Sequence, residues 1–136
     1  MAESQHHIKL VDELASWISN TLLNGDNGLM LIDHPKSEMI GRPPKVGGYI
    51  PDIFVPRGIN YNLIIGEAKT ANDLEKSHSV KQIKEFILKC KEFENSIFIL
   101  AVPWYLVPLA RSIIRKIVVE CNASSVEIKI LEKLAA

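Results

Sequence analysis

The stretch Tyr49–Lys69, YIPDIFVPRGINYNLIIGEAK, consists of two apolar runs that carry three charged residues, Asp52, Glu67 and Lys69. Both runs are rich in Ile, Val, Tyr and Phe, which favour strands. The Pro-Arg-Gly-Ile-Asn segment between the runs has residues typical of turns. The stretch therefore predicts a β-hairpin with charged groups inside it.

The three charges need a physical explanation. Asp52 lies within an apolar run, where a buried carboxylate must be paired, protonated or bound to a metal. Glu67 and Lys69 are two residues apart, so in a strand their side chains share one face, about 7 Å apart. If the strands pair, Asp52 and Glu67 converge beside Lys69, which suits a divalent cation. A simple ion pair between Glu67 and Lys69 is the alternative, but it leaves Asp52 unexplained.

Composition sets broad limits. The 136 residues, 47% of them hydrophobic, predict a single domain spanning 1–136. Sixteen basic and sixteen acidic residues cancel, so any attraction to nucleic acid must be local. Cys90 and Cys121 lie in apolar contexts and predict reduced core thiols. The sequence shows neither a membrane span nor a signal-peptide pattern, which predicts a cytoplasmic protein without a membrane partner.

The rest of the chain predicts alternating helices and strands. Apolar periodicity gives helices at about 4–23, 77–93 and 106–120, and strands at about 29–32, 49–55, 61–69, 96–102 and 126–131. The order is helix, three strands, helix, strand, then helix and strand. This order predicts an α/β fold in which a mixed β-sheet is flanked by helices on both faces.

Two motifs lie in the predicted hairpin, Pro51-Asp52 in its first strand and Gly66–Lys69, GEAK, at the end of its second. With the elements around them, they resemble the PD-(D/E)xK nuclease superfamily and its restriction-endonuclease-like core. The resemblance covers most of the chain, and the placement of the motifs carries it, because the motif alone is short. A single domain of this size is similar to Holliday-junction resolvases and to nucleases of replication and repair.

The resemblance implies a metal-dependent nuclease that hydrolyses phosphodiester bonds. The sequence does not decide between DNA and RNA, and DNA is the favoured substrate. Asp52, Glu67 and the carbonyl of Ala68 are the implied ligands of Mg²⁺, for which Mn²⁺ can substitute, and Lys69 is implied to act on the attacking water. Mg²⁺ prefers such hard oxygen ligands. A homodimer or a place in a larger nucleic-acid-processing complex is compatible with this function. The alternative is a relative of the same fold that binds nucleic acid or protein without catalysis.

The first two long helices are expected to supply auxiliary groups. Members of the superfamily often use an acid from the first helix; Asp12, Glu13 or neither fills that role here, and Glu13 is our first choice. Gln82 and Phe86 resemble the Gln-x-x-x-Tyr element of exonuclease-like branches, although Phe lacks the hydroxyl. Gln82 therefore joins the candidate catalytic residues.

Four further residues are candidate nucleic-acid contacts: Arg42, Lys45, Arg57 and His78. The first three bracket the Asp52 strand, so they would form a local basic rim. His78 shares a helix flank with Gln82.

Several other polar and aromatic residues have weaker interpretations. The apolar cluster Trp104–Leu106 is a candidate interface between subunits. Arg111, Arg115 and Lys116 are expected on the solvated face of the third helix. We interpret His34 as a loop residue, and His6 and His7 as terminal residues without a role.

Overall fold

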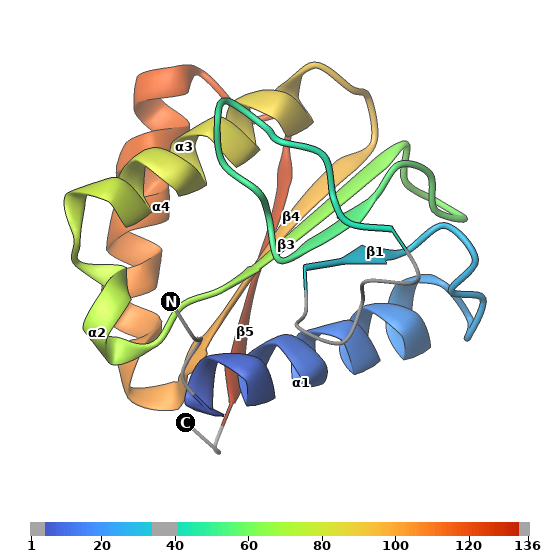
Figure 1. Ribbon diagram of the computed structural model, residues 1–136. Coiled ribbons are helices and arrows are strands. Elements are labelled where there is room, and N and C mark those ends of the chain that lie inside the picture. The colour runs from blue at the N-terminus through green and yellow to red at the C-terminus, as the bar shows by residue number, and fades with distance from the viewer. Residues whose placement is uncertain (1–4, 34–40, 134–136) are drawn as a thin grey trace.

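The computed structural model describes residues 5–33 and 41–133, which form a five-stranded β-sheet with helices on both faces (Figure 1). The helices are α1 (Gln5–Leu22), α2 (Ala71–Leu74), α3 (Ser77–Lys91) and α4 (Val107–Cys121), with a 3-10 turn η1 (Trp104–Leu106). The strands are β1 (Leu31–Ile32), β2 (Ile53–Val55), β3 (Leu63–Ala68), β4 (Ser96–Pro103) and β5 (Glu127–Lys133).

The sheet is mixed, as the sequence predicts, and its strands lie in chain order. β2 is antiparallel to both β1 and β3, whereas β3, β4 and β5 run parallel to one another. The predicted hairpin is therefore confirmed as β2 and β3, with Ile53 opposite Gly66. This register brings Asp52, the residue before Ile53, next to Glu67.

The first strand of the hairpin is shorter than predicted, because it begins at Ile53 instead of near residue 49. Val46 and Tyr49 pair with each other across a tight turn, in which Gly47 and Gly48 have φ values of 60° and 90°. Glycine adopts such angles without steric cost. Pro51 then lacks the N–H that a strand ladder requires. These two features keep residues 46–51 out of the sheet.

Other boundaries also differ from the sequence-based expectation: β1 and β3 are each shorter than expected, and β5 extends to Lys133. The short helix α2 occupies part of a segment expected to be a polar connection. The second long helix ends at Lys91, because a turn follows in which Asn95 adopts a left-handed φ of 54°. Asn tolerates this conformation better than most residues.

The core lies in two layers, one on each face of the sheet. On one face α1 buries a helical stripe that packs against the sheet: Leu10, Val11, Leu14 and Ile18, over Ile53, Ile64, Ile97 and Ile99. On the other face α3 and α4 cover the alternate strand residues: Ile83, Phe86, Ile87 and Ile114, over Ile65, Phe98 and Leu100. Each fully buried side chain of this kind stabilises the fold by roughly 1.5–3 kcal/mol. β4 is buried along its whole length, as predicted.

Both cysteines are free and buried, which confirms their prediction as reduced core thiols. Burial raises the pKa of the Cys90 thiol to about 12. None of the helices that the structure describes is both long and apolar enough to cross a bilayer.

We predict that Gly66→Ala destabilises the protein by about 1–3 kcal/mol through overpacking. A methyl group at this position would lie 3.1 Å from Leu14 Cδ2 and 3.2 Å from Ile18 Cδ1, so α1 would have to move away from β3. Urea unfolding measures the effect. Gly28→Ala is the control, because its methyl would lie on the surface, 3.4 Å from Asp26 Oδ1. Equal stability of the two variants would contradict the packing of α1 on β3.

Candidate active site

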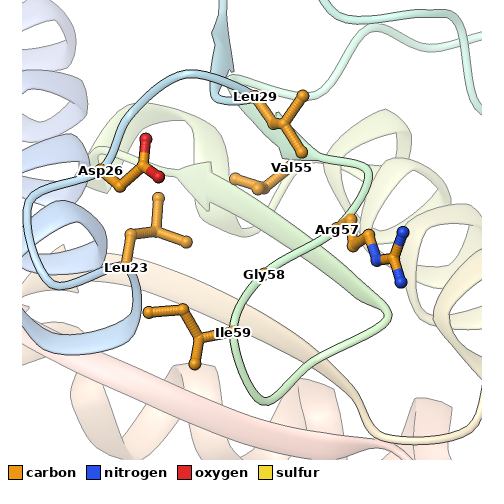
Figure 2. Close-up of a pocket in the computed structure, with 7 residues that line it drawn as sticks. All are labelled: Leu23, Asp26, Leu29, Val55, Arg57, Gly58 and Ile59. Carbon is orange, nitrogen blue, oxygen red and sulfur yellow. The ribbon is translucent and has the colours of Figure 1, made fainter.

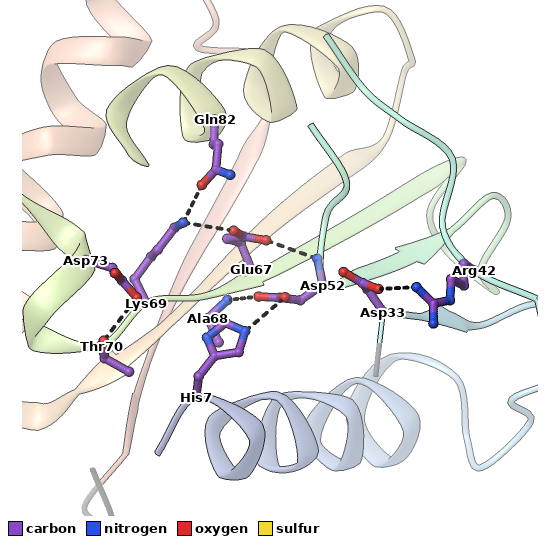
Figure 3. A network of polar contacts seen from close by, with 10 residues as sticks. All are labelled: His7, Asp33, Arg42, Asp52, Glu67, Ala68, Lys69, Thr70, Asp73 and Gln82. Carbon is purple, nitrogen blue, oxygen red and sulfur yellow. Dashed lines mark hydrogen bonds and ion pairs between the residues drawn. The ribbon is translucent and has the colours of Figure 1, made fainter. Parts of the chain in front are cut away.

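Two buried carboxylates lie close together where β2 begins and β3 ends (Figure 3). Each of them accepts a hydrogen bond from a backbone N–H of the other segment. The backbone N–H of Asp52 donates to Glu67 Oε1 at 3.0 Å. In return, the backbone N–H of Ala68 donates to Asp52 Oδ2 at 2.8 Å. Asp52 is 5% exposed and Glu67 is 3% exposed. Backbone donors therefore hold both acids in fixed positions away from bulk water.

The ammonium group of Lys69 lies beside these acids. Its Nζ is 3.2 Å from Glu67 Oε2, and it donates a hydrogen bond to Gln82 Oε1 (Figure 3). The backbone N–H of Lys69 donates to the carbonyl of Ala101 in β4 at 3.0 Å. The structure thus brings together Asp52, Glu67, Lys69 and Gln82, as the sequence predicts.

His7, which we interpreted as a terminal residue without a role, also belongs to this network. Its Nε2 lies 3.2 Å from Asp52 Oδ1, and its side chain is 15% exposed. A signal was available in the sequence, because His7 precedes Leu10, Val11 and Leu14 by three, four and seven residues. This spacing places it on the buried stripe of α1.

Asp33 is a second residue that sequence reasoning missed. Its backbone N–H donates to the carbonyl of Asp52 at 2.8 Å, because β1 pairs with β2. Its carboxylate lies 3.8 Å from the guanidinium of Arg42 (Figure 3). The pKa of Asp33 is raised, first by burial and then by the negative charge of Asp52.

The acids at this site repel one another. The pKa of Glu67 is raised well above its usual value of 4.5, chiefly by burial and next by the charge of Asp52. Lys69 opposes the shift, because its positive charge favours the ionised form of Glu67. A bound cation would act in the same direction as Lys69.

The donor atoms suit a hard divalent cation. Within residues 5–33 and 41–133, no cluster of three or more His, Cys, Asp and Glu side chains could hold a metal ion. Mg²⁺ does not need such a cluster, since one or two carboxylates, waters and substrate phosphate can complete its coordination. The N–H and C=O of a strand residue point to the same side. The carbonyl of Ala68 therefore faces the same side as its N–H, toward Asp52.

The first helix contributes His7 to the network. Asp12 is exposed and Glu13 is half-buried, and both line a groove on the surface of α1 together with Lys9 and Trp17. An active-site role for Glu13 remains a prediction.

The expected basic rim is not continuous. Arg42 lies near Asp33, and Lys45 is exposed in the loop before β2. Arg57 follows β2 and so lies at the other end of the hairpin from Asp52. There it lines a hollow of about 200 Å³, with Leu23 and Ile59 among its neighbours (Figure 2). Arg57 therefore lies beyond β2 from Arg42 and Lys45, and its contact with nucleic acid remains a prediction.

His78 is exposed in the first turn of α3, one turn before Gln82. This position leaves its side chain accessible to a ligand approaching that helix. His34 lies outside the described residues.

Comparison of the chain with protein-family models, with curated proteins and with solved structures finds no match.

We predict that the metal-free protein loses stability as the pH rises from 4.5 toward neutrality. The raised pKa of Glu67 means that the folded state binds more protons than the unfolded state in this range, so the free energy of unfolding falls with pH. The raised pKa of Asp33 acts in the same direction. Chemical unfolding in EDTA at several pH values measures the slope.

Asp52→Asn should make this slope shallower, because it removes a charge that raises the pKa of both other acids. Asp26→Asn is the control, since Asp26 is exposed in the turn after α1. Equal slopes for wild type and Asp52→Asn would contradict the proposed repulsion.

Proposed function

We propose that the protein is a metal-dependent nuclease that hydrolyses phosphodiester bonds in DNA. The observation that carries this proposal is the pair of buried carboxylates, in which Glu67 accepts the N–H of Asp52 and Asp52 accepts the N–H of Ala68. The ammonium of Lys69 lies 3.2 Å from one oxygen of Glu67. The resemblance of these residues to the PD-(D/E)xK motif supports the same function.

Stability alone does not account for this cluster. A buried ion pair often contributes little or nothing compared with apolar residues of similar size, because both charges lose their hydration. Here a second carboxylate increases the unfavourable charge around Glu67. Buried groups with shifted pKa values, held by several elements, are more typical of functional sites.

The proposed chemistry assigns a task to each residue. Asp52, Glu67 and the carbonyl of Ala68 would hold the cation. A bound divalent cation polarises the phosphoryl oxygen and lowers the pKa of a water molecule. Lys69 has three N–H donors, of which Glu67 and Gln82 take two. We assign the third to the attacking water or to a phosphate oxygen.

Gln82 and His7 act through these groups. Gln82 accepts a hydrogen bond from Lys69 and so fixes the direction of the ammonium, which makes it a positioning residue. His7 contacts Asp52 Oδ1 and limits the rotation of that carboxylate. Fixed groups of this kind accelerate reactions because they need little rearrangement in the transition state.

A protein of similar fold that binds nucleic acid or a protein without catalysis is the second candidate. The observation that favours it is the low exposure of the three central side chains, 3–6%. Little of their surface is available for contact with a substrate. The following experiment separates the two candidates.

We predict that wild type cleaves DNA with Mg²⁺ or Mn²⁺ and that Asp52→Asn or Lys69→Met lowers the rate about 100-fold or more. Supercoiled, linear, single-stranded and junction DNA are the substrates. Lys81→Met, an exposed residue of α3, is the matched control for Lys69 and should cleave as wild type does. Absence of cleavage on all substrates would favour the non-catalytic candidate. Full activity of both site variants would contradict the assignment of catalysis to Asp52 and Lys69.

We also predict that Mn²⁺ raises the melting temperature of wild type, because a ligand that binds only the folded state stabilises it. The gain should be larger at neutral than at acidic pH, since protons compete with the cation for Glu67. Asp52→Asn should show little or no gain, and Asp26→Asn should match wild type. An undiminished gain in Asp52→Asn would remove Asp52 from the cation site.

A further inference from the structure

Two aromatic side chains project from the protein at the end of β4. Trp104 is 54% exposed and Tyr105 is 51% exposed. Their rings meet edge to face, with centroids 5.7 Å apart and planes at 86°. Adjacent exposed apolar side chains form a patch, and such patches mark sites that bind a ligand or a partner. We call Trp104 and Tyr105 the aromatic pair.

The aromatic pair lies at the same end of the sheet as the candidate active site. β3 and β4 are parallel, with Ala68 opposite Ala101, and the N–H of Lys69 donates to the Ala101 carbonyl. Trp104 follows Ala101 by three residues, which corresponds to roughly 10 Å of strand length. A ligand in the active site could therefore extend onto the rings.

The exposed face of α4 continues from the aromatic pair and is basic. Arg111, Arg115 and Lys116 are exposed, and the only acid in this helix, Glu120, lies in its last turn. The spacing of Trp104, Arg111 and Arg115 by seven and four residues favours one side of the chain. The whole molecule is neutral, so this face provides a local positive charge.

A second copy of the chain is a poor fit for this surface. Two half-exposed rings offer roughly 200 Å², if each has the area typical of an aromatic side chain. A stable interface needs about 800 Å² from each partner. The next large exposed apolar residue of α4, Val119, lies near the other end of the helix.

We propose that the aromatic pair stacks on bases of single-stranded DNA and that the basic face of α4 follows its phosphates. Aromatic rings beside a positively charged surface are the combination that binds single strands without reading their sequence. Bases inside a duplex are already stacked and do not offer their faces. This inference rests on the proposed nuclease function, and it assigns to that site substrates with unpaired nucleotides beside the scissile bond.

Fluorescence anisotropy with a labelled oligothymidylate tests the inference. The measurement uses the full chain in EDTA, so that no cleavage occurs. We expect wild type to bind this strand more tightly than a blunt duplex of equal length. The double variant Trp104→Ala and Tyr105→Ala should lose about tenfold or more in affinity. Trp104→Phe, which keeps a ring, should retain most of the binding.

Phe93→Ala is the matched control. Phe93 is also an exposed aromatic residue, but it precedes β4 and so lies at the opposite end of the sheet. It should bind as wild type does. Circular dichroism verifies that each variant is folded. We expect all of them to fold, because the rings of Trp104, Tyr105 and Phe93 are exposed.

Two affinity results would overturn the inference: equal affinity of wild type and the double variant, or equal affinity of wild type for strand and duplex. A dimer in sedimentation that the double variant abolishes would also overturn it, in favour of a second copy as the occupant. Cleavage by wild type together with any of these results leaves the nuclease function intact. If the double variant loses strand binding but wild type cleaves none of the DNA substrates, only the nuclease function is contradicted.

Discussion

The reciprocal hydrogen bonds between the Asp52 and Glu67 segments are the constraint on which the site depends. Each acid accepts a backbone N–H from the other strand, so neither carboxylate can move without breaking a contact between β2 and β3. The register that opposes Ile53 to Gly66 makes this exchange possible. Glycine at that point lets α1 pack closely beneath the site. The hairpin of β2 and β3 is therefore part of both the core of the fold and the candidate site.

The residues of the candidate site lie together at one end of the sheet. β3 carries Glu67 and Lys69 there, α3 supplies Gln82, and the first turn of α1 supplies His7. Because β4 runs parallel to β3, the aromatic pair after β4 reaches the same end. The proposed catalytic centre and the proposed surface for a single strand are therefore adjacent. The groups that would bind substrate and those that would cleave it are neighbours in space.

The elements predicted correctly from the sequence are those in which buried residues recur at a regular spacing. The stripe of α1, the continuous apolar run of β4 and the charged hairpin are all visible in the pattern of apolar residues. The same stripe includes His7, so its position was predictable although we assigned it no role. Asp33 was harder, because a strand of two residues has no period to read. Arg57 and Asp52 are close in sequence but lie at opposite ends of β2, a separation that composition alone does not show.

The central claim is that Asp52 and Glu67 together hold a divalent cation. Anomalous diffraction from crystals grown with Mn²⁺ tests it most directly. We expect one strong peak within about 2.0–2.3 Å of an oxygen of each carboxylate, with the Ala68 carbonyl nearby. A peak at another place in the protein would contradict the claim. So would the absence of any peak in crystals in which Glu67 Oε2 keeps its contact with Lys69.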